Sequence, residues 1–179
     1  MKKGFTLIEL LIVIGILAIL ATVVVLVLNP AKLLAQARDA QRMSDLASVK
    51  SAIALYLATA DSPAVGATSK GTVSTACWFG TTCTTTCSGI STSTAVDGTG
   101  WINVDLTGTT GGSPLSALPL DPSQTATYQY AYIGDATNLT FELNARLESE
   151  KYLGLMANEK DGGNNANYYE IGTEPGLDL

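Results

Sequence analysis

The chain has 179 residues, contains no histidine and carries a formal net charge of −6. It therefore lacks the commonest general base and metal ligand, and its few basic residues form no patch of the kind that binds nucleic acid. Only 15% of the residues are charged, which is typical of a secreted or surface-displayed polypeptide. We expect a protein that is not an enzyme, requires no cofactor and binds no nucleic acid.

A long apolar segment follows the basic pair Lys2-Lys3. Residues 5–28 are apolar with four exceptions, and as a helix with a rise of about 1.5 Å per residue they extend about 36 Å. This length crosses a hydrocarbon core of about 30 Å. We therefore predict a membrane-spanning helix over 5–28. The basic pair favours a cytoplasmic N-terminus, but Lys32, Arg38 and Arg42 follow the helix, so the orientation rests mainly on the resemblance given below. The four exceptions are Thr6, Glu9, Gly15 and Thr22.

Two of these exceptions have structural consequences. A carboxylate at membrane depth costs about 2.5–3.5 kcal/mol on insertion scales, and no basic residue stands between Glu9 and Lys32. Glu9 is therefore expected to find its partner outside its own chain. Gly15 is a position where the helix can kink or can approach another helix closely.

The position of Gly4 differs from that of the small residue in an ordinary secretory signal. A secretory signal has its cleavage site after the apolar stretch, whereas Gly4 stands before it. Cleavage after Gly4 removes only residues 1–4 and leaves the apolar helix on the mature protein. We interpret 1–4 as a leader peptide and 5–28 as a transmembrane and assembly helix.

The pattern Gly-Phe-Thr-Leu-Ile-Glu-Leu at residues 4–10 closely resembles the type III signal of type IV pilins and type II secretion pseudopilins. The resemblance implies that a prepilin peptidase cuts between Gly4 and Phe5 and then methylates the amine of Phe5. It also assigns Glu9 to assembly. In a helical stack of subunits, Glu9 of one copy can pair with the Phe5 amine of the next, so that neither charge is buried alone.

Asn29-Pro30 interrupts the helical pattern. Proline inside a helix removes a hydrogen bond and clashes with the preceding turn, so either the helix kinks at Pro30 or Asn29 caps a new helix. Residues 29–60 form an amphipathic pattern, and we expect the apolar face to pack on a globular domain. The apolar residues at three- and four-residue spacing are Leu46, Val49, Ile53, Tyr56 and Leu57.

Residues 61–100 are rich in serine and threonine and show no helical or strand periodicity. We predict a long surface loop here, with short strands near 72–78. An extracytoplasmic loop can form a disulfide, and an odd number of cysteines leaves one thiol over. Any of the three pairings is compatible with the sequence. The cysteines are Cys77, Cys83 and Cys87.

Residues 101–179 form the predicted sheet region. The two strands around the turn at 134–138 alternate apolar and polar residues and predict an antiparallel hairpin. One face of this hairpin must be covered, and the amphipathic helix is the available cover. The predicted strands are 127–133, 139–147 and 168–172, and 100–106 is predicted as a short strand or the entry to a strand.

A polar, glycine-rich loop lies at 160–167. The segment Leu-Pro-Leu-Asp-Pro at 118–122 and the strands after it resemble the globular domain of pilins and major pseudopilins. Major pseudopilins bind calcium in a comparable C-terminal loop, which implies Ca²⁺ as a candidate ligand with Asp161 and Asn164 as oxygen donors. A plain turn is the favoured interpretation, because the loop holds a single carboxylate.

These patterns predict an α+β, pilin-like fold: a long kinked helix, first membrane-embedded and then amphipathic, packs on a small antiparallel sheet of three or four strands. The resemblance implies a structural subunit that forms a helical homo-oligomeric filament. It names as partners the prepilin peptidase, a membrane platform protein and an assembly ATPase, with membrane lipid as the surroundings before assembly.

The expected location is a single pass through the inner membrane, with the C-terminal domain outside the cytoplasm, and then a surface filament. Two alternatives stand beside this function. One is a major pseudopilin of a type II secretion system, and the other is a membrane-anchored binding module that does not polymerise.

Overall fold

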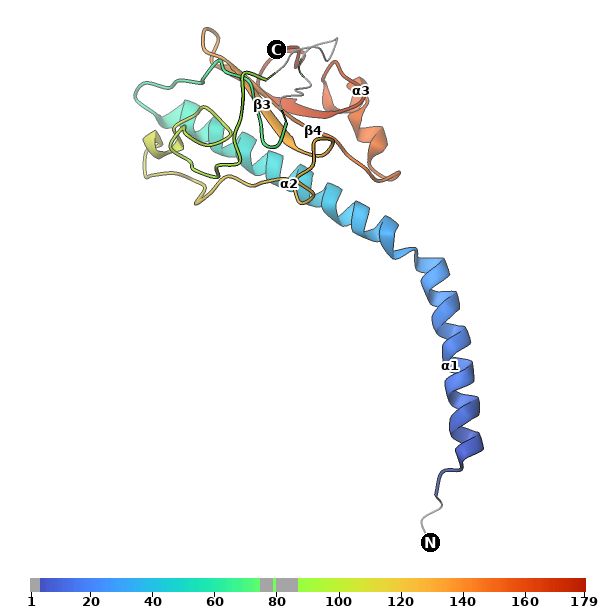
Figure 1. The fold of residues 1–179 in the computed structure, drawn as a ribbon. Coiled ribbons are helices and arrows are strands. Elements are labelled where there is room, and N and C mark those ends of the chain that lie inside the picture. Colours follow the sequence, from blue (N-terminus) through green and yellow to red (C-terminus); the bar gives the residue numbers. More distant parts are fainter. Residues whose placement is uncertain (1–3, 75–78, 80–86) are drawn as a thin grey trace. The chain divides into compact units, whose positions relative to one another are not determined.

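The computed structural model describes residues 4–74, 79 and 87–179 (Figure 1). The chain divides into two units, Met1–Ala35 and Gln36–Leu179, and the boundary between them lies within the second helix. Each unit is described by itself below.

The first unit contains helix α1, Leu7–Leu28. Its segment Leu7–Val25 is long and apolar enough to span a membrane. The helix begins at the N-cap Thr6, continues through Gly15 and ends at Asn29, whose φ of 39° lies in the left-handed region. This conformation breaks the helical hydrogen-bond pattern between α1 and the helix that follows.

Helix α2, Pro30–Thr59, starts directly after this break. The Asn29 carbonyl accepts the backbone N–H of Lys32 at 2.9 Å, and the Asn29 side chain also accepts it at 3.4 Å. Asn29 therefore caps a new helix, and Pro30 occupies the first helical position, where its missing N–H is not needed. Of the two interpretations of Asn29-Pro30, the second is the one observed.

The second unit is built on a five-stranded sheet of order β2-β1-β3-β4-β5. The central hairpin of β3 and β4 pairs Tyr130 with Ala145 at one end and Asp135 with Thr140 at the other. Only the pair β1 and β2 is parallel among the described strands. The strands are β1 Lys70–Gly71, β2 Gly89–Ile90, β3 Tyr130–Asp135, β4 Thr140–Ala145 and β5 Tyr169–Gly172, and the shorter helices are η1 Leu106–Gly108, η2 Leu153–Met156 and α3 Asn158–Asp161.

One face of the sheet packs against α2 and forms the main core. Removing each of these large apolar side chains from water contributes roughly 1.5–3 kcal/mol. The predicted apolar face of the helix is confirmed, since four of its five residues are buried and Leu57 is partly buried. Core residues from α2 are Leu46, Val49, Ile53 and Tyr56, and those from the hairpin are Tyr130, Tyr132, Phe141 and Leu143.

The predicted strand at 100–106 is wrong. Trp101 and Ile102 are adjacent and both fully buried, so this segment does not alternate between a buried and an exposed face as a strand does. It is an irregular segment that enters η1, and the Trp101 indole N–H donates to the Pro119 carbonyl at 2.9 Å. The segment contributes a core layer without joining the sheet.

Other boundaries also differ from the predicted ones. The strand expected at 127–133 is β3 and extends to Asp135, so Tyr128 lies outside it. Among the described residues the sheet has five strands instead of three or four, because the Ser/Thr-rich region supplies β1 and β2. These two strands have two residues each, which is too short for a periodic pattern to reveal them. The α+β fold itself is confirmed.

Candidate functional site

The N-terminal segment carries the predicted processing and assembly residues. The Thr6 N–H and hydroxyl both donate to the Glu9 carboxylate, at 2.9 and 2.8 Å, and the Glu9 N–H donates to the Thr6 hydroxyl at 3.3 Å. This reciprocal arrangement is a capping box, which satisfies two otherwise unpaired donors at the helix start. In the single subunit, Glu9 is thus hydrogen-bonded within its own first turn and has no cation beside it among the described residues.

The described apolar side chains of α1 are exposed around the whole helix. Phe5 is 76% exposed and Leu7 is 81% exposed, and the same holds along the helix to Leu28. A helix that is apolar on all sides is stable only inside a membrane or among other protein surfaces. The predicted cleavage site between Gly4 and Phe5 lies just before this helix, at exposed residues that belong to no helix or strand.

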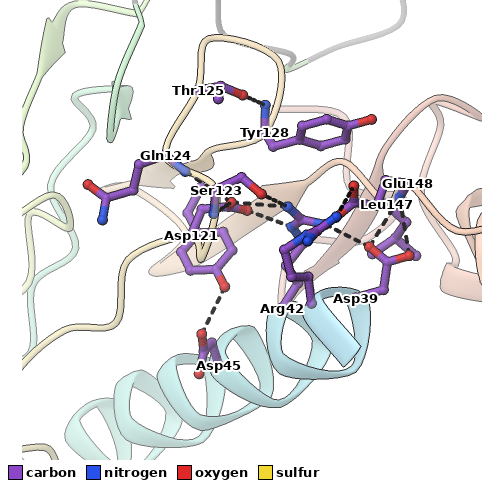
Figure 2. A network of polar contacts seen from close by, with 12 residues as sticks. Asp39, Arg42, Asp45, Asp121, Ser123, Gln124, Thr125, Tyr128, Leu147 and Glu148 are labelled. Carbon is purple, nitrogen blue, oxygen red and sulfur yellow. Dashed lines mark hydrogen bonds and ion pairs between the residues drawn. The ribbon is translucent and has the colours of Figure 1, made fainter. Parts of the chain in front are cut away.

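A second constellation, which we call the Arg42 cluster, lies in the second unit and consists of Asp39, Arg42, Asp121, Ser123 and Glu148. All five N–H groups of the Arg42 guanidinium are used. Two donate to Asp121 at 2.7 and 3.1 Å, two donate to Asp39 and Glu148 at 2.8 Å each, and one donates to Ser123 at 3.0 Å (Figure 2). The side chains of Arg42, Asp39 and Asp121 are completely buried.

The cluster joins three parts of the chain. Asp39 accepts the backbone N–H groups of Glu148 and Ser149, at 2.8–3.2 Å, and so connects α2 to the segment after β4. Arg38 extends the cluster outward through a bidentate contact with Glu148 at 2.6 and 2.9 Å. The Tyr128 ring lies 4.8 Å from the Arg42 guanidinium carbon (Figure 2). Tyr128 precedes the first residue of β3, Tyr130, so its ring is not held in the sheet.

The charges in the cluster stabilise each other. Burial acts to lower the pKa of Arg42, but the hydrogen bonds that Arg42 donates to Asp121 and Glu148 outweigh it, so the pKa rises. The hydrogen bond from Arg38 holds the pKa of Glu148 below its usual range. Buried ion pairs of this kind are strongly destabilising when one partner is removed.

The single substitution Arg42→Met is therefore expected to lower the free energy of unfolding by about 3 kcal/mol. It leaves two buried carboxylates, Asp39 and Asp121, without their cation. Urea titration of the full chain in detergent micelles measures the effect. Lys50→Met, which removes a positive charge from α2 outside the cluster, is the matched control. A loss below about 1 kcal/mol for Arg42→Met would contradict the expectation.

Sequence reasoning missed the Arg42 cluster. Arg42 and Asp39 are charged, but they continue the stripe of Leu46 and Val49 at spacings of three and four residues. The buried series of α2 is Asp39, Arg42, Leu46, Val49, Ala52, Ile53 and Tyr56. The sequence did contain a signal for the cluster, because Asp39 and Arg42 occupy positions that the helical period assigns to the buried face of α2.

A pair of buried carboxyl groups lies on the other face of the sheet. Glu142 on β4 and Glu170 on β5 share this face, since Glu170 pairs in register with Asn144, and both are fully buried. Burial raises the pKa of Glu142 to about 8 and that of Glu170 to about 7. Like charges in a buried site oppose ionisation, so the charge of Glu170 adds to burial in raising the pKa of Glu142. The alternation of β4 did not predict a buried polar face.

The predicted calcium residues, Asp161 and Asn164, lie beside this pair. Asp161 accepts the backbone N–H groups of Gly163 and Glu170, at 3.1 and 3.3 Å, which is how a turn uses a carboxylate. Neither side-chain polar atom of Asn164 has a hydrogen-bond partner among the described residues. The part of the chain that the structure describes gathers no group of three histidine, cysteine or acidic side chains that could hold a metal.

The predicted disulfide falls largely outside the described residues, which include neither Cys77 nor Cys83. Cys87 is buried in a small second core with Phe79 and Ala131 and is disulfide-bonded. The choice of its partner stays open between the two other cysteines.

One comparison with known proteins bears on the N-terminal segment. Residues 1–25 match the family model described as the prokaryotic N-terminal methylation motif. The comparisons with curated proteins and with solved structures gave no match. The matched residues include Gly4, Phe5 and Glu9, whose pattern carried the resemblance found in the sequence. Residues 1–25 thus carry the prokaryotic N-terminal methylation motif, which is the prepilin signal to which residues 4–10 were found similar.

Proposed function

We propose that this protein is the structural subunit of a type IV pilus-like surface filament. The observation that carries the proposal is the conjunction of the methylation motif at residues 1–25 with a helix whose apolar side chains are exposed along its length. Lipid covers such a surface before assembly, and the same helix of other copies covers it afterwards. Other copies of the same chain can therefore cover the apolar surface of α1 without a different protein partner.

Assembly on this proposal exchanges one set of contacts of Glu9 for another. In the single subunit the carboxylate accepts two hydrogen bonds from Thr6. After cleavage, Phe5 carries a methylated amine only four residues before Glu9. In a stack of subunits this amine lies within reach of a neighbour's carboxylate, and an ion pair in an apolar environment fixes the axial spacing between copies.

The Ser/Thr-rich region 61–100 favours a displayed pilin over a secretion pseudopilin. A polar region of this length has a use on a fibre exposed to the surroundings and less use on one that remains in the periplasm. The processing and assembly partners of the proposal are a prepilin peptidase, a membrane platform protein and an assembly ATPase. The subunit would cross the inner membrane once before it joins the filament.

The first experiment is mass spectrometry of the mature N-terminus. We expect a chain that begins at N-methylated Phe5 and lacks residues 1–4. An intact Met1, or cleavage after the apolar segment, would overturn the proposal.

A second experiment separates the filament from the secretion system. Deletion of the gene is expected to remove surface fibres and leave protein secretion intact. Loss of secretion with unchanged fibres would instead support the major pseudopilin. Normal fibres and normal secretion would favour the anchored binding module.

A further inference from the structure

The part of α2 nearest the start of the second unit is held by polar contacts. The buried residues of this helix begin with Asp39 and Arg42, and the first buried apolar residue is Leu46. Hydrophobic contact has no directional preference, so the apolar stripe of α2 selects the face that meets the sheet but fixes the exact position of the helix less sharply than hydrogen bonds do. The Arg42 cluster is directional, because each of its five hydrogen bonds requires a particular position of the guanidinium plane.

The cluster is a poor means of gaining stability alone. Apolar residues of similar volume often replace a buried ion-pair group with no loss of stability, because they avoid the cost of removing charges from water. Fixing a register is the best-attested use of buried polar groups. A shift of α2 by one residue moves each side chain about 1.5 Å along the helix and about 100° around it. Such a shift would separate Arg42 from Asp121 and Glu148, which belong to other segments.

The register of α2 determines which of its side chains face outward. Between positions 37 and 58 the exposed residues of α2 carry no charge, and every charged residue of this stretch is buried or half-buried. A rotation of one residue would bring charged positions of the cluster toward the exposed side. Among the exposed residues are Ala37, Ala40, Ser44, Ala47, Ser51 and Ala54.

We infer that the Arg42 cluster sets the register in which α2 docks on the sheet, and so fixes the uncharged helix face that a subunit offers to its neighbours. Arg42 is thus a positioning residue for assembly, acting through α2 and not through direct contact with another copy. The inference rests on the proposed function, because it assigns a role in filament formation to residues of a single subunit.

The test variant removes the charges of Asp39, Arg42 and Asp121 but keeps side-chain oxygens that can accept backbone N–H groups. In the triple variant Asp39→Asn, Arg42→Met and Asp121→Asn, the remaining side-chain oxygens can still accept the backbone N–H groups of Ser123 and Ser149. The full chain is melted in detergent micelles, and surface filaments are counted by electron microscopy at matched subunit levels. We expect a melting temperature close to that of the wild type and about tenfold fewer filaments, since the register is no longer specified.

A triple variant with wild-type melting and wild-type filament number would overturn the inference. If the triple variant does not fold, the single variant Arg42→Lys tests the inference. Lysine keeps the positive charge but lacks the planar fork of donors. A folded Arg42→Lys chain with about tenfold fewer filaments supports the register role, and one with full filaments overturns it. Failure of both variants to fold also overturns it, because the cluster then serves stability.

Lys50→Met is the matched control and is expected to change neither measurement. Failure of this inference is distinguishable from failure of the proposed function. Wild-type cells that produce no filaments contradict the proposed function. Filaments in both the wild type and the folded triple variant contradict the register role alone.

Discussion

Replacing Glu9 with leucine is expected to abolish filament formation while leaving the subunit in the membrane. Leucine makes α1 more apolar, so insertion is unimpaired or improved. On the proposed assembly, however, the neighbour's Phe5 amine is then left buried without a counter-charge at every contact along the fibre. Removing one partner of a buried pair costs about 3–5 kcal/mol, which corresponds to more than a hundredfold loss at each added subunit. Filament counts and membrane fractionation of the same cells measure the two effects.

Glu9→Gln separates the ion pair from the capping box. The glutamine side chain can still accept the Thr6 N–H and hydroxyl bonds that Glu9 accepts in the single subunit, but it carries no charge. We expect Glu9→Gln to be as defective in assembly as Glu9→Leu. Normal fibres from the glutamine variant would show that capping, and not charge pairing, is what assembly requires. Thr22→Val, a change elsewhere in α1 that removes a hydroxyl bonded to the Ala18 carbonyl, is the control for helix composition.

Stability of the second unit is expected to fall as the pH rises from about 5 to about 8. The pKa values of Glu142 and Glu170 are raised by burial to about 8 and about 7 in the folded chain, from an ordinary value of 4.5. The folded state therefore binds more protons than the unfolded state in this range, and the free energy of unfolding decreases with pH. The stabilisation is fully present below pH 4.5 and is lost as the pH passes through the raised values. Its loss is on the order of 5 kcal/mol.

Urea titrations of the full chain at a series of pH values measure this slope. The double variant Glu142→Gln and Glu170→Gln is expected to show a flat profile over the same range, because neither side chain titrates. Glu159→Gln changes an exposed carboxylate of α3 and should keep the wild-type slope. A wild-type chain whose free energy of unfolding is constant from pH 5 to 8 would contradict the raised pKa values of Glu142 and Glu170. Below pH 4.5 the contribution of Glu148 has the opposite sign. Its pKa is lowered in the folded chain, so protonation of Glu148 as the pH falls weakens the Arg42 cluster.

The sequence predicted best those elements whose hydrophobic pattern repeats over many residues. The 22 residues of α1 and the spacing of Leu46, Val49, Ile53 and Tyr56 in α2 gave both helices and the buried face. The hairpin of β3 and β4 followed from the alternation of Phe141, Leu143 and Ala145. Residues that act through local patterns were therefore visible before the structure, including the N-terminal motif around Glu9.

Features that depend on distant segments were not visible. Arg42 meets Asp121 across 79 positions and Glu148 across 106 positions of the chain, and no local pattern specifies such a meeting. The burial of Glu142 depends on the C-terminal segment, whose Leu179 N–H donates to its carboxylate at 3.2 Å. Trp101 looked like part of a strand because adjacent apolar residues fit both a strand and a buried irregular segment.

In the filament that we propose, the shortness of the outer strands limits how copies can join. The sheet ends with the two residues of β2 on one side and the four residues of β5 on the other. Such edges offer few backbone groups for strand addition by a second chain. Subunits in a fibre are held at very high effective concentration, where longer edges would join into a continuous cross-β ladder. Contacts between copies are then left to side chains and helices, so a subunit can enter or leave the fibre without breaking a shared sheet.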